Sequence, residues 1–234
     1  MPAQPLPEDV FLEAFARAPT RDLAPGQVLL AAGAPADEVF NILDGMLMMS
    51  RTGSDGRRQV LSFLFRDNFI GLTTADRYYF TIQAVTAARV ACRPRADFES
   101  RLLRDPEADR TFRNMTLRVL EDLLDKIYSL GQRTALERLA VFLLYLRHSR
   151  RLADGLVEDG NPALGDVSLP MTREDIADYL GLQKETVSRS FGQLEKRGLI
   201  RRLDSHRVQL LDLGRLRALA GVVDFASPQR LPRS

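Results

Sequence analysis

The chain has 234 residues, of which 45% are hydrophobic, with a formal net charge of +2, one cysteine and two histidines. This length allows one large domain or two ordinary ones, and the composition excludes an intrachain disulfide, a cysteine-based metal cluster within one subunit and an ordinary zinc site. No apolar run reaches about 18 residues, and the Pro-rich start MPAQPLPEDV lacks a signal-peptide pattern. We therefore expect a cytoplasmic protein with no membrane partner. Because Cys and His are so few, we also expect no metal or other cofactor.

The first part of the chain has a β-strand pattern. Residues 1–9 are expected to form a loose leader, and residues 10–18 a short amphipathic helix. From residue 21 to about residue 94, short β-prone runs alternate with Gly, Pro, Asp and Asn. The runs are residues 27–31, 39–43, 46–50, 59–65, 81–85 and 89–93. Seven or so strands at this spacing predict an antiparallel sandwich or barrel.

After Pro94 the pattern becomes helical. A short helix is expected over residues 95–103, and Pro106 is well placed in the first turn of a long helix that extends to about Leu130. One apolar stripe has the 3-4-3 spacing of a coiled-coil seam: Leu117, Leu120, Leu124 and Ile127. A second stripe consists of Phe112, Val119, Leu123 and Leu130. Two stripes require two partners, which we expect to be the β domain and a second copy of the helix. Burial of the whole helix within one chain is the alternative.

Two short helices joined by a tight turn are expected between residues 169 and 200, after a helix over residues 134–148 and a loop with little structure over residues 149–168. Thr172 is a suitable N-cap, with Asp175 three residues later. Gly181 is suited to end the first helix with a positive φ, and Leu182 to enter the core behind it. The second helix is expected to begin near Gln183 or Lys184 and to bury Val187, Phe191 and Leu194.

The opposite face of that second helix carries polar side chains suited to DNA. Glu185 and Arg189 are four residues apart, so the carboxylate is placed to orient the guanidinium. A fixed arginine can contact guanine O6 and N7, a glutamate can accept from cytosine N4, and Ser188 is small enough to let the helix enter a major groove. This pattern predicts a DNA-binding helix-turn-helix. The alternative is an ordinary helical hairpin with a solvated polar face.

The following segment, RRLDSHRVQLL, predicts a β-hairpin that would form a wing beside the recognition helix. Residues 183–207 contain seven Lys or Arg and three Asp or Glu, a local net charge of +4. Positive charge is therefore concentrated where DNA phosphates would lie. Further candidate DNA contacts are Thr172, Gln183, Lys184, Thr186, Arg201, Arg202, His206 and Arg207. A last short helix is expected near residues 213–220.

The sequence resembles the CRP/FNR superfamily of bacterial transcription regulators over nearly its whole length. The similarity is strongest in TALERLAVFLL and in residues 169–200, and is also visible in GAPADEVFNILDG and RTGSDGRRQVLSFLFRDNFIGL. The resemblance implies an α+β fold: an N-terminal jelly roll of the cyclic-nucleotide-binding type over residues 1–104, a dimerisation helix over 105–131 and a winged helix-turn-helix over 132–234.

The segment ETVSR is similar to the FNR/FixK branch, in which the matching Glu, Ser and Arg contact the bases of a TTGA-type half-site. The resemblance therefore implies that Glu185, Ser188 and Arg189 are the base-contacting residues. Lys184 and Gln183 depart from the pattern of this branch, which leaves the outer positions of the half-site open. The implied protein is a homodimeric activator that binds double-stranded DNA at a palindromic site and contacts RNA polymerase.

Cyclic-AMP-binding members of the superfamily carry an Arg-Ser pair that holds the phosphate, because a buried phosphate requires charge-assisted hydrogen bonds. These positions fall on Tyr78 and Tyr79 here, and Gly71 is followed by Leu72 instead of Glu. The FNR iron–sulfur cluster needs four cysteines, whereas this chain has only Cys92. We therefore expect activity without cyclic nucleotide.

Two alternatives remain open. One is a ligand-dependent or haem-dependent gas or redox sensor of the same superfamily. The other is a jelly-roll protein that does not bind DNA. An enzyme is not expected, because the sequence shows no nucleophile–base arrangement or phosphate-binding Gly loop, and no histidine precedes His148 to supply a cupin-type metal site.

Overall fold

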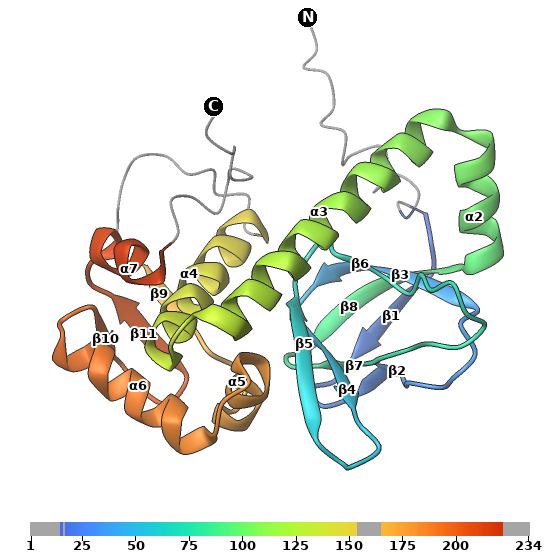
Figure 1. Cartoon of the computed structure of the whole chain (residues 1–234). Coiled ribbons are helices and arrows are strands. Elements are labelled where there is room, and N and C mark those ends of the chain that lie inside the picture. The colour runs from blue at the N-terminus through green and yellow to red at the C-terminus, as the bar shows by residue number, and fades with distance from the viewer. Residues whose placement is uncertain (1–14, 16, 154–164, 222–234) are drawn as a thin grey trace, which may run out of the picture. The chain divides into compact units, whose positions relative to one another are not determined.

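The computed structural model describes residues 15, 17–153 and 165–221 (Figure 1). The chain divides into two compact units, one ending at Ile127 and one beginning at Tyr128. The expected leader lies outside the described residues, as does most of the expected helix over residues 10–18. Among the described residues, no helix combines the length and apolar character needed to cross a membrane.

The described part of the first unit contains eight β-strands in two antiparallel sheets. The sheet orders are β1-β8-β3-β6 and β2-β7-β4-β5. The strands are β1 (Thr20–Leu23), β2 (Val28–Leu30), β3 (Glu38–Asp44), β4 (Leu47–Thr52), β5 (Arg58–Leu64), β6 (Phe69–Ile70), β7 (Thr81–Ala84) and β8 (Ala88–Pro94). Buried side chains from both sheets form one core. The predicted antiparallel β architecture is therefore confirmed, while β1 and β6 had not been predicted.

Alternation along β3 explains how both faces of its sheet are covered. Phe40 and Ile42 point into the core between the sheets, whereas Val39 packs in a second cluster on the outer face. Cys92 lies opposite Phe40 on β8 and is buried. Burial raises the pKa of its thiol, so Cys92 is a core side chain with little thiolate character.

Helix α2 (Arg95–Arg104) and the first turns of α3 (Pro106–Gln132) pack on that outer face. The rings of Phe69 and Phe98 stack with centroids 4.9 Å apart, and the Phe112 centroid lies 6.0 Å from that of Phe98. Asp105 Oδ1 accepts hydrogen bonds from the amides of residues 107 and 108, which begins α3 just before its proline.

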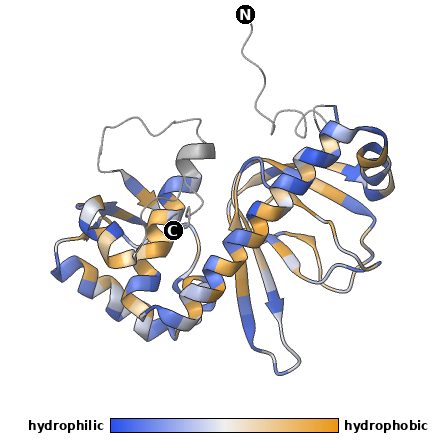
Figure 2. Ribbon diagram, turned by 45° about the horizontal axis from the view of Figure 1, so that its top comes forward, coloured by the Kyte–Doolittle hydropathy of each residue, from blue (hydrophilic) through white to orange (hydrophobic). Residues whose placement is uncertain are grey.

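The expectation that the β domain covers the second apolar stripe of α3 is met only at Phe112. Val119 and Leu123 remain 53% and 47% exposed, because α3 extends beyond the outer-face cluster before it reaches them. Leu130 belongs to the second unit. Figure 2 shows the apolar residues as orange bands along the length of α3.

The second unit combines helices with a small sheet. Its elements are the end of α3, α4 (Ala135–Ala153), β9 (Asp166–Ser168), α5 (Arg173–Leu180), α6 (Lys184–Lys196), β10 (Ile200–Arg202), β11 (Arg207–Leu210) and α7 (Leu213–Ala220). The strand order is β10-β11-β9. Helix α4 packs against α6 and α7, and its Leu139 and Leu143 are fully buried.

The predicted loop over residues 149–168 is wrong at both ends. Helix α4 continues to Ala153, and Asp166–Ser168 forms strand β9. Val167 pairs with Val208 of β11 and is buried. Residues 154–164 lie outside the described residues. The pairing of β9 is long-range, so local sequence around residue 166 gave little indication of a strand.

Candidate nucleic-acid interface

The turn between α5 and α6 has the expected local geometry. Thr172 Oγ1 accepts from the amide of Asp175 at 3.0 Å, and Asp175 Oδ2 accepts from the amide of Thr172 at 2.9 Å. This reciprocal capping box begins α5. Gly181 ends it with a φ of +63°, a conformation that favours glycine. Leu182, which follows, is half-buried.

Helix α6 separates an apolar face from a polar one. Val187, Phe191 and Leu194 are buried, as expected, and so is Ser190, whose hydroxyl donates to the Thr186 carbonyl at 2.9 Å. The side chains of Glu185, Ser188 and Arg189 are exposed on the other face, as are those of Gln183 and Lys184 at the start of the helix. Gln183 is the N-cap without a side-chain capping bond.

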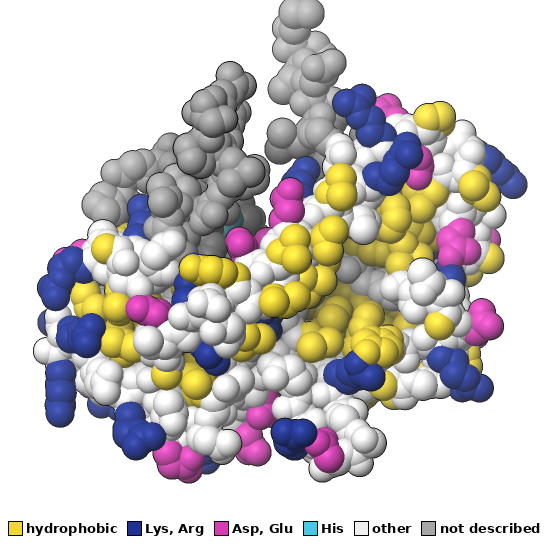
Figure 3. Space-filling view, in the orientation of Figure 1, with side chains coloured by type: hydrophobic (Ala, Val, Ile, Leu, Met, Phe, Trp, Pro, Cys, Tyr) yellow, Lys and Arg dark blue, Asp and Glu magenta, His cyan; other side chains and the backbone are white. Residues whose placement is uncertain are grey.

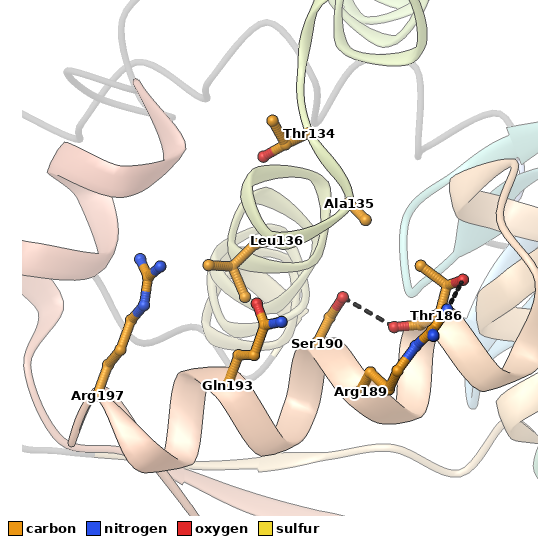
Figure 4. Close-up of a pocket in the computed structure, with 8 residues that line it drawn as sticks. All are labelled: Thr134, Ala135, Leu136, Thr186, Arg189, Ser190, Gln193 and Arg197. Atoms are coloured by element: carbon orange, nitrogen blue, oxygen red, sulfur yellow. Dashed lines mark hydrogen bonds between the residues drawn. The ribbon is translucent and has the colours of Figure 1, made fainter.

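The expected pairing of Glu185 with Arg189 is not found. Arg189 Nη2 donates instead to Thr186 Oγ1 at 3.1 Å, as Figure 4 shows. The hydrogen bond to Thr186 can replace an ion pair with Glu185, because an exposed ion pair contributes at most about 1 kcal/mol to stability. Ser188 Oγ donates to the Lys184 carbonyl at 3.0 Å. Within the described part of the chain, Glu185 makes no ion pair.

A groove of about 470 Å³ lies between α6 and the beginning of α4 (Figure 4). It is lined by Thr134, Ala135, Leu136, Thr186, Arg189, Ser190, Gln193 and Arg197. Two guanidinium groups, hydroxyl groups and the N-terminus of a 19-residue helix border the same space, and each of these favours an anion. Sequence reasoning did not find this groove, because Thr134 and Arg197 are far apart in the chain.

The predicted wing is confirmed as a β-hairpin. Strands β10 and β11 pair with Ile200 opposite Leu210. Asp204 organises the turn: its Oδ1 accepts from the His206 amide at 2.7 Å, and its Oδ2 accepts from Arg207 Nε at 2.8 Å. The hydrogen bond from Arg207 holds the pKa of the exposed Asp204 carboxyl below its usual value.

His206 fastens the wing to the rest of the unit. Its carbonyl oxygen accepts from the Leu169 amide at 2.6 Å, and its Nδ1 lies 3.1 Å from the Leu169 carbonyl oxygen. Arg173 of α5 donates to the Ser205 carbonyl at 3.4 Å, and its guanidinium lies 3.9 Å from the ring centroid of Phe191. The turn of the wing is thus held against both helices of the motif.

Arg202 joins the wing to α6. Its Nε and Nη2 lie 2.8 and 2.6 Å from Glu195 Oε2, and its amide donates to Glu195 Oε1 at 3.1 Å. This bonding lowers the pKa of Glu195. The charge of Arg202 is therefore largely compensated, whereas neighbouring Arg201 is exposed and makes no ion pair within the described residues.

The expected coiled-coil seam lies on an open surface in the first unit. Leu117, Leu120, Leu124 and Ile127 are 57%, 51%, 56% and 65% exposed. Figure 3 shows hydrophobic side chains gathered along α3. Large contiguous apolar patches mark interaction sites in proteins, so this face is available to a partner.

The two tyrosines that stand at the Arg-Ser positions of cyclic-AMP-binding members differ in burial. Tyr78 is buried in the core between the sheets, while Tyr79 is exposed, with the Arg51 guanidinium 3.8 Å from its ring centroid. Arg77 Nη1 donates to the Gly33 carbonyl at 2.6 Å. No group of three or more His, Cys, Asp or Glu side chains suited to a metal ion occurs among the described residues.

Two known protein families match the sequence of this chain. Residues 20–105 match the cyclic nucleotide-binding domain, and residues 137–219 match the Crp-like helix-turn-helix domain. The nitrogen fixation regulation protein FixK of Bradyrhizobium diazoefficiens is 36% identical over 77% of this chain and 73% of its own. The chain belongs to the CRP/FNR family of transcription regulators.

Two further relatives agree. The transcriptional activator protein FnrL of Cereibacter sphaeroides is 32% identical over 86% of this chain and 80% of its own. The structure of FixK2 from Bradyrhizobium japonicum superposes with a TM-score of 0.75 and 29% identity, covering 86% of this chain and 96% of that one. This CRP/FNR regulator is therefore a FixK-like DNA-binding protein and not an enzyme, and the alternative of a jelly roll that does not bind DNA is wrong.

Proposed function

We propose that this CRP/FNR regulator is a homodimer that binds a two-fold symmetric DNA site with TTGA-type half-sites and activates transcription without cyclic nucleotide. The exposed polar face of α6 is the observation that carries the proposal. A helix of this kind, anchored by Val187 and Phe191 and preceded by a capped helix and a glycine turn, is suited to enter a major groove.

Base contacts are assigned to Glu185, Ser188 and Arg189. All three side chains point away from the core of the unit. Rotation of Arg189 away from Thr186 exchanges one hydrogen bond to a hydroxyl group for two hydrogen bonds to guanine, which is the stronger arrangement. Glu185 is then placed to accept from the cytosine of the same base pair.

Phosphate contacts are assigned to both sides of the recognition helix. On one side lies the groove lined by Thr134, Gln193 and Arg197. On the other lies the wing with Arg201. Thr172, Gln183, Lys184 and Thr186 lie at the N-terminal ends of α5 and α6, where helix dipoles favour phosphate. For Arg202, His206 and Arg207 the hydrogen bonds within the protein support a role in holding the wing.

The dimer is supported by the open apolar face of α3. Four seam residues at coiled-coil spacing are more than half exposed, and a second copy of the same helix presents the same face, as a two-fold interface requires. Val119 and Leu123 widen the apolar surface beyond the seam itself. A symmetric dimer in turn requires a symmetric DNA site.

Independence from cyclic nucleotide is supported by Tyr78. This buried core side chain stands at the position where cyclic-AMP-binding members carry the phosphate-binding arginine. Activation of transcription is supported by the relatives, since FnrL of Cereibacter sphaeroides is named a transcriptional activator. Contact with RNA polymerase is part of the proposal, as the step through which an activator would act.

A binding titration tests the proposal. Purified protein is titrated onto one duplex with two TTGA half-sites whose centres are one helical turn apart, ~34 Å, and onto a second with one half-site scrambled. We expect much tighter binding to the paired site, without added nucleotide. Equal binding to both duplexes would argue against a dimer that recognises both half-sites. A haem absorbance band in the purified protein would instead favour the gas-sensing alternative.

A further inference from the structure

Three helix-terminal carbonyl groups of the second unit converge on one side chain, that of Arg138 on α4. Its Nη2 donates to the Leu130 carbonyl in the last turn of α3 at 2.7 Å. Its Nε donates to the carbonyl of Arg133, the first residue after α3, at 2.9 Å. Its Nη1 donates to the Leu180 carbonyl, at the end of α5, at 3.0 Å.

These carbonyl groups need an external donor because each lies at or just beyond a helix C-terminus. The amide of Thr134, four residues after Leu130, donates to Glu137 Oε2 at 2.8 Å instead of continuing α3. A planar guanidinium supplies donors in several fixed directions, which an ammonium group does not. Its positive charge is also favourable at the C-terminal ends of α3 and α5.

A second contact joins the same elements. Gly181, in the turn between α5 and α6, lies so close to the end of α3 that a Cβ atom there would be 3.2 Å from Leu130 Cδ2 and 3.7 Å from Arg138 Nη1. The helix-turn-helix is therefore fixed against the last turn of α3 by directed hydrogen bonds and by close packing. Neither the bonds nor the packing involves a residue assigned to DNA contact.

We propose that Arg138 is a positioning residue that sets the half-site spacing at which this regulator binds DNA. The inference rests on the proposed dimer, in which α3 pairs with its copy. Helix α3 is continuous from Pro106 to Gln132, so its last turn is the end of the element through which the copies would meet. A side chain that fixes α5 to that turn restricts the positions available to each recognition helix.

The test uses the full-length protein and duplexes that differ only in the distance between half-sites, shortened or lengthened by one and two base pairs. A duplex with a single half-site is included. The variants are Arg138→Met, which keeps the aliphatic stem, and Arg138→Lys, which keeps the charge. Arg215→Met is the matched control, because it removes a guanidinium that donates to one carbonyl, that of Arg197, away from α3.

Wild type and Arg215→Met are expected to prefer one spacing strongly. In Arg138→Met this preference should fall by about tenfold or more, while affinity for the single half-site changes by less than about threefold. Arg138→Lys should lose the spacing preference to the same extent as Arg138→Met. If Arg138→Met does not fold, the spacing profile of Arg138→Lys decides the result. An unchanged spacing profile in the folded variants would overturn the inference. A wild type without any spacing preference would instead overturn the proposed dimer.

Discussion

The phenol of Tyr78 is bound twice to the backbone of Glu38. Its Oη donates to the Glu38 carbonyl at 2.7 Å and accepts from the Glu38 amide at 3.3 Å. Burial raises the pKa of this phenol, so it stays protonated and able to donate. Gly71 lies equally close, since a Cβ atom there would be 2.7 Å from the Glu38 carbonyl oxygen. Tyr78, which stands where cyclic-AMP-binding members carry the phosphate-binding arginine, and Gly71 are thus both packed onto the first residue of β3.

This packing predicts that cyclic AMP has no effect. A ligand that binds only the folded state at a hundredfold excess over Kd raises the free energy of unfolding by about 2.7 kcal/mol. Differential scanning fluorimetry with and without cyclic AMP should show no shift in Tm, and the Kd for DNA should not change. A shift corresponding to that stabilisation would show that the folded protein binds cyclic AMP despite the buried Tyr78.

The seam of α3 predicts the oligomeric state. Replacing Leu120 and Leu124 by Glu puts four like charges into the expected two-fold interface, where burial of unpaired charge is strongly unfavourable. The double variant should sediment as a monomer. Leu103→Glu is the control, because Leu103 lies on α2, is 88% exposed and is outside the seam. A double variant that still sediments as a dimer, as wild type is expected to do, would show that these residues do not form the dimer interface.

Lys126 predicts a pH dependence of stability. Its Nζ donates to the carbonyls of Val60 and Leu61 at 3.2 and 2.6 Å, which favours the charged amine. Burial acts in the opposite direction and lowers its pKa from 10.5 to about 7. Between these two values the unfolded chain binds more protons than the folded one, so this group makes the free energy of unfolding rise with pH. Below about pH 7 both states are protonated and its contribution is constant.

The measurement is urea unfolding of wild type and Lys126→Met at several pH values from below 7 to above 9. The free energy of unfolding of wild type relative to the variant should increase as pH rises through this window. A difference that is the same at every pH would mean that Lys126 keeps its ordinary pKa in the folded protein.

The wing predicts two different roles for neighbouring arginines. Arg201→Ala should weaken binding to all DNA sequences alike and reduce the slope of log K against log salt by about 0.9 for each phosphate that the side chain neutralises in the wild type. The charge-neutral double variant Glu195→Gln/Arg202→Gln removes the ion pair and should leave that slope unchanged. Salt titrations of both proteins on random DNA separate the roles. A reduced slope in the double variant would assign Arg202 to a phosphate.

Local signals in the sequence were sufficient for much of the architecture. The capping box at Thr172, the glycine turn and the apolar spacing of α6 are properties of neighbouring residues, and each is present in the structure. Helix α7 also has the expected bounds. The strand runs with clear alternation were predicted for the same reason.

Features that depend on distant partners were not predicted. Strand β9 exists because three residues pair with β11 about 40 positions later, and β6 has only two residues. Arg138 contacts backbone carbonyls, which carry no residue-specific signal. The choice of Arg189 between Glu185 and Thr186 depends on side-chain rotamers, which spacing along a helix does not fix.

We propose that α6 recognises the DNA sequence through Arg189. The direct measurement is the affinity of wild type and Arg189→Ala for three duplexes: the TTGA-type consensus, the same site with its G·C pairs inverted, and random DNA. Arg197→Ala, which removes the other guanidinium that lines the groove, serves as the phosphate-contact control. We predict that Arg189→Ala weakens binding by about 1–3 kcal/mol per half-site on the consensus and by little on the other two. Equal weakening on all three duplexes would mean that Arg189 contacts the DNA backbone and does not read the G·C pair.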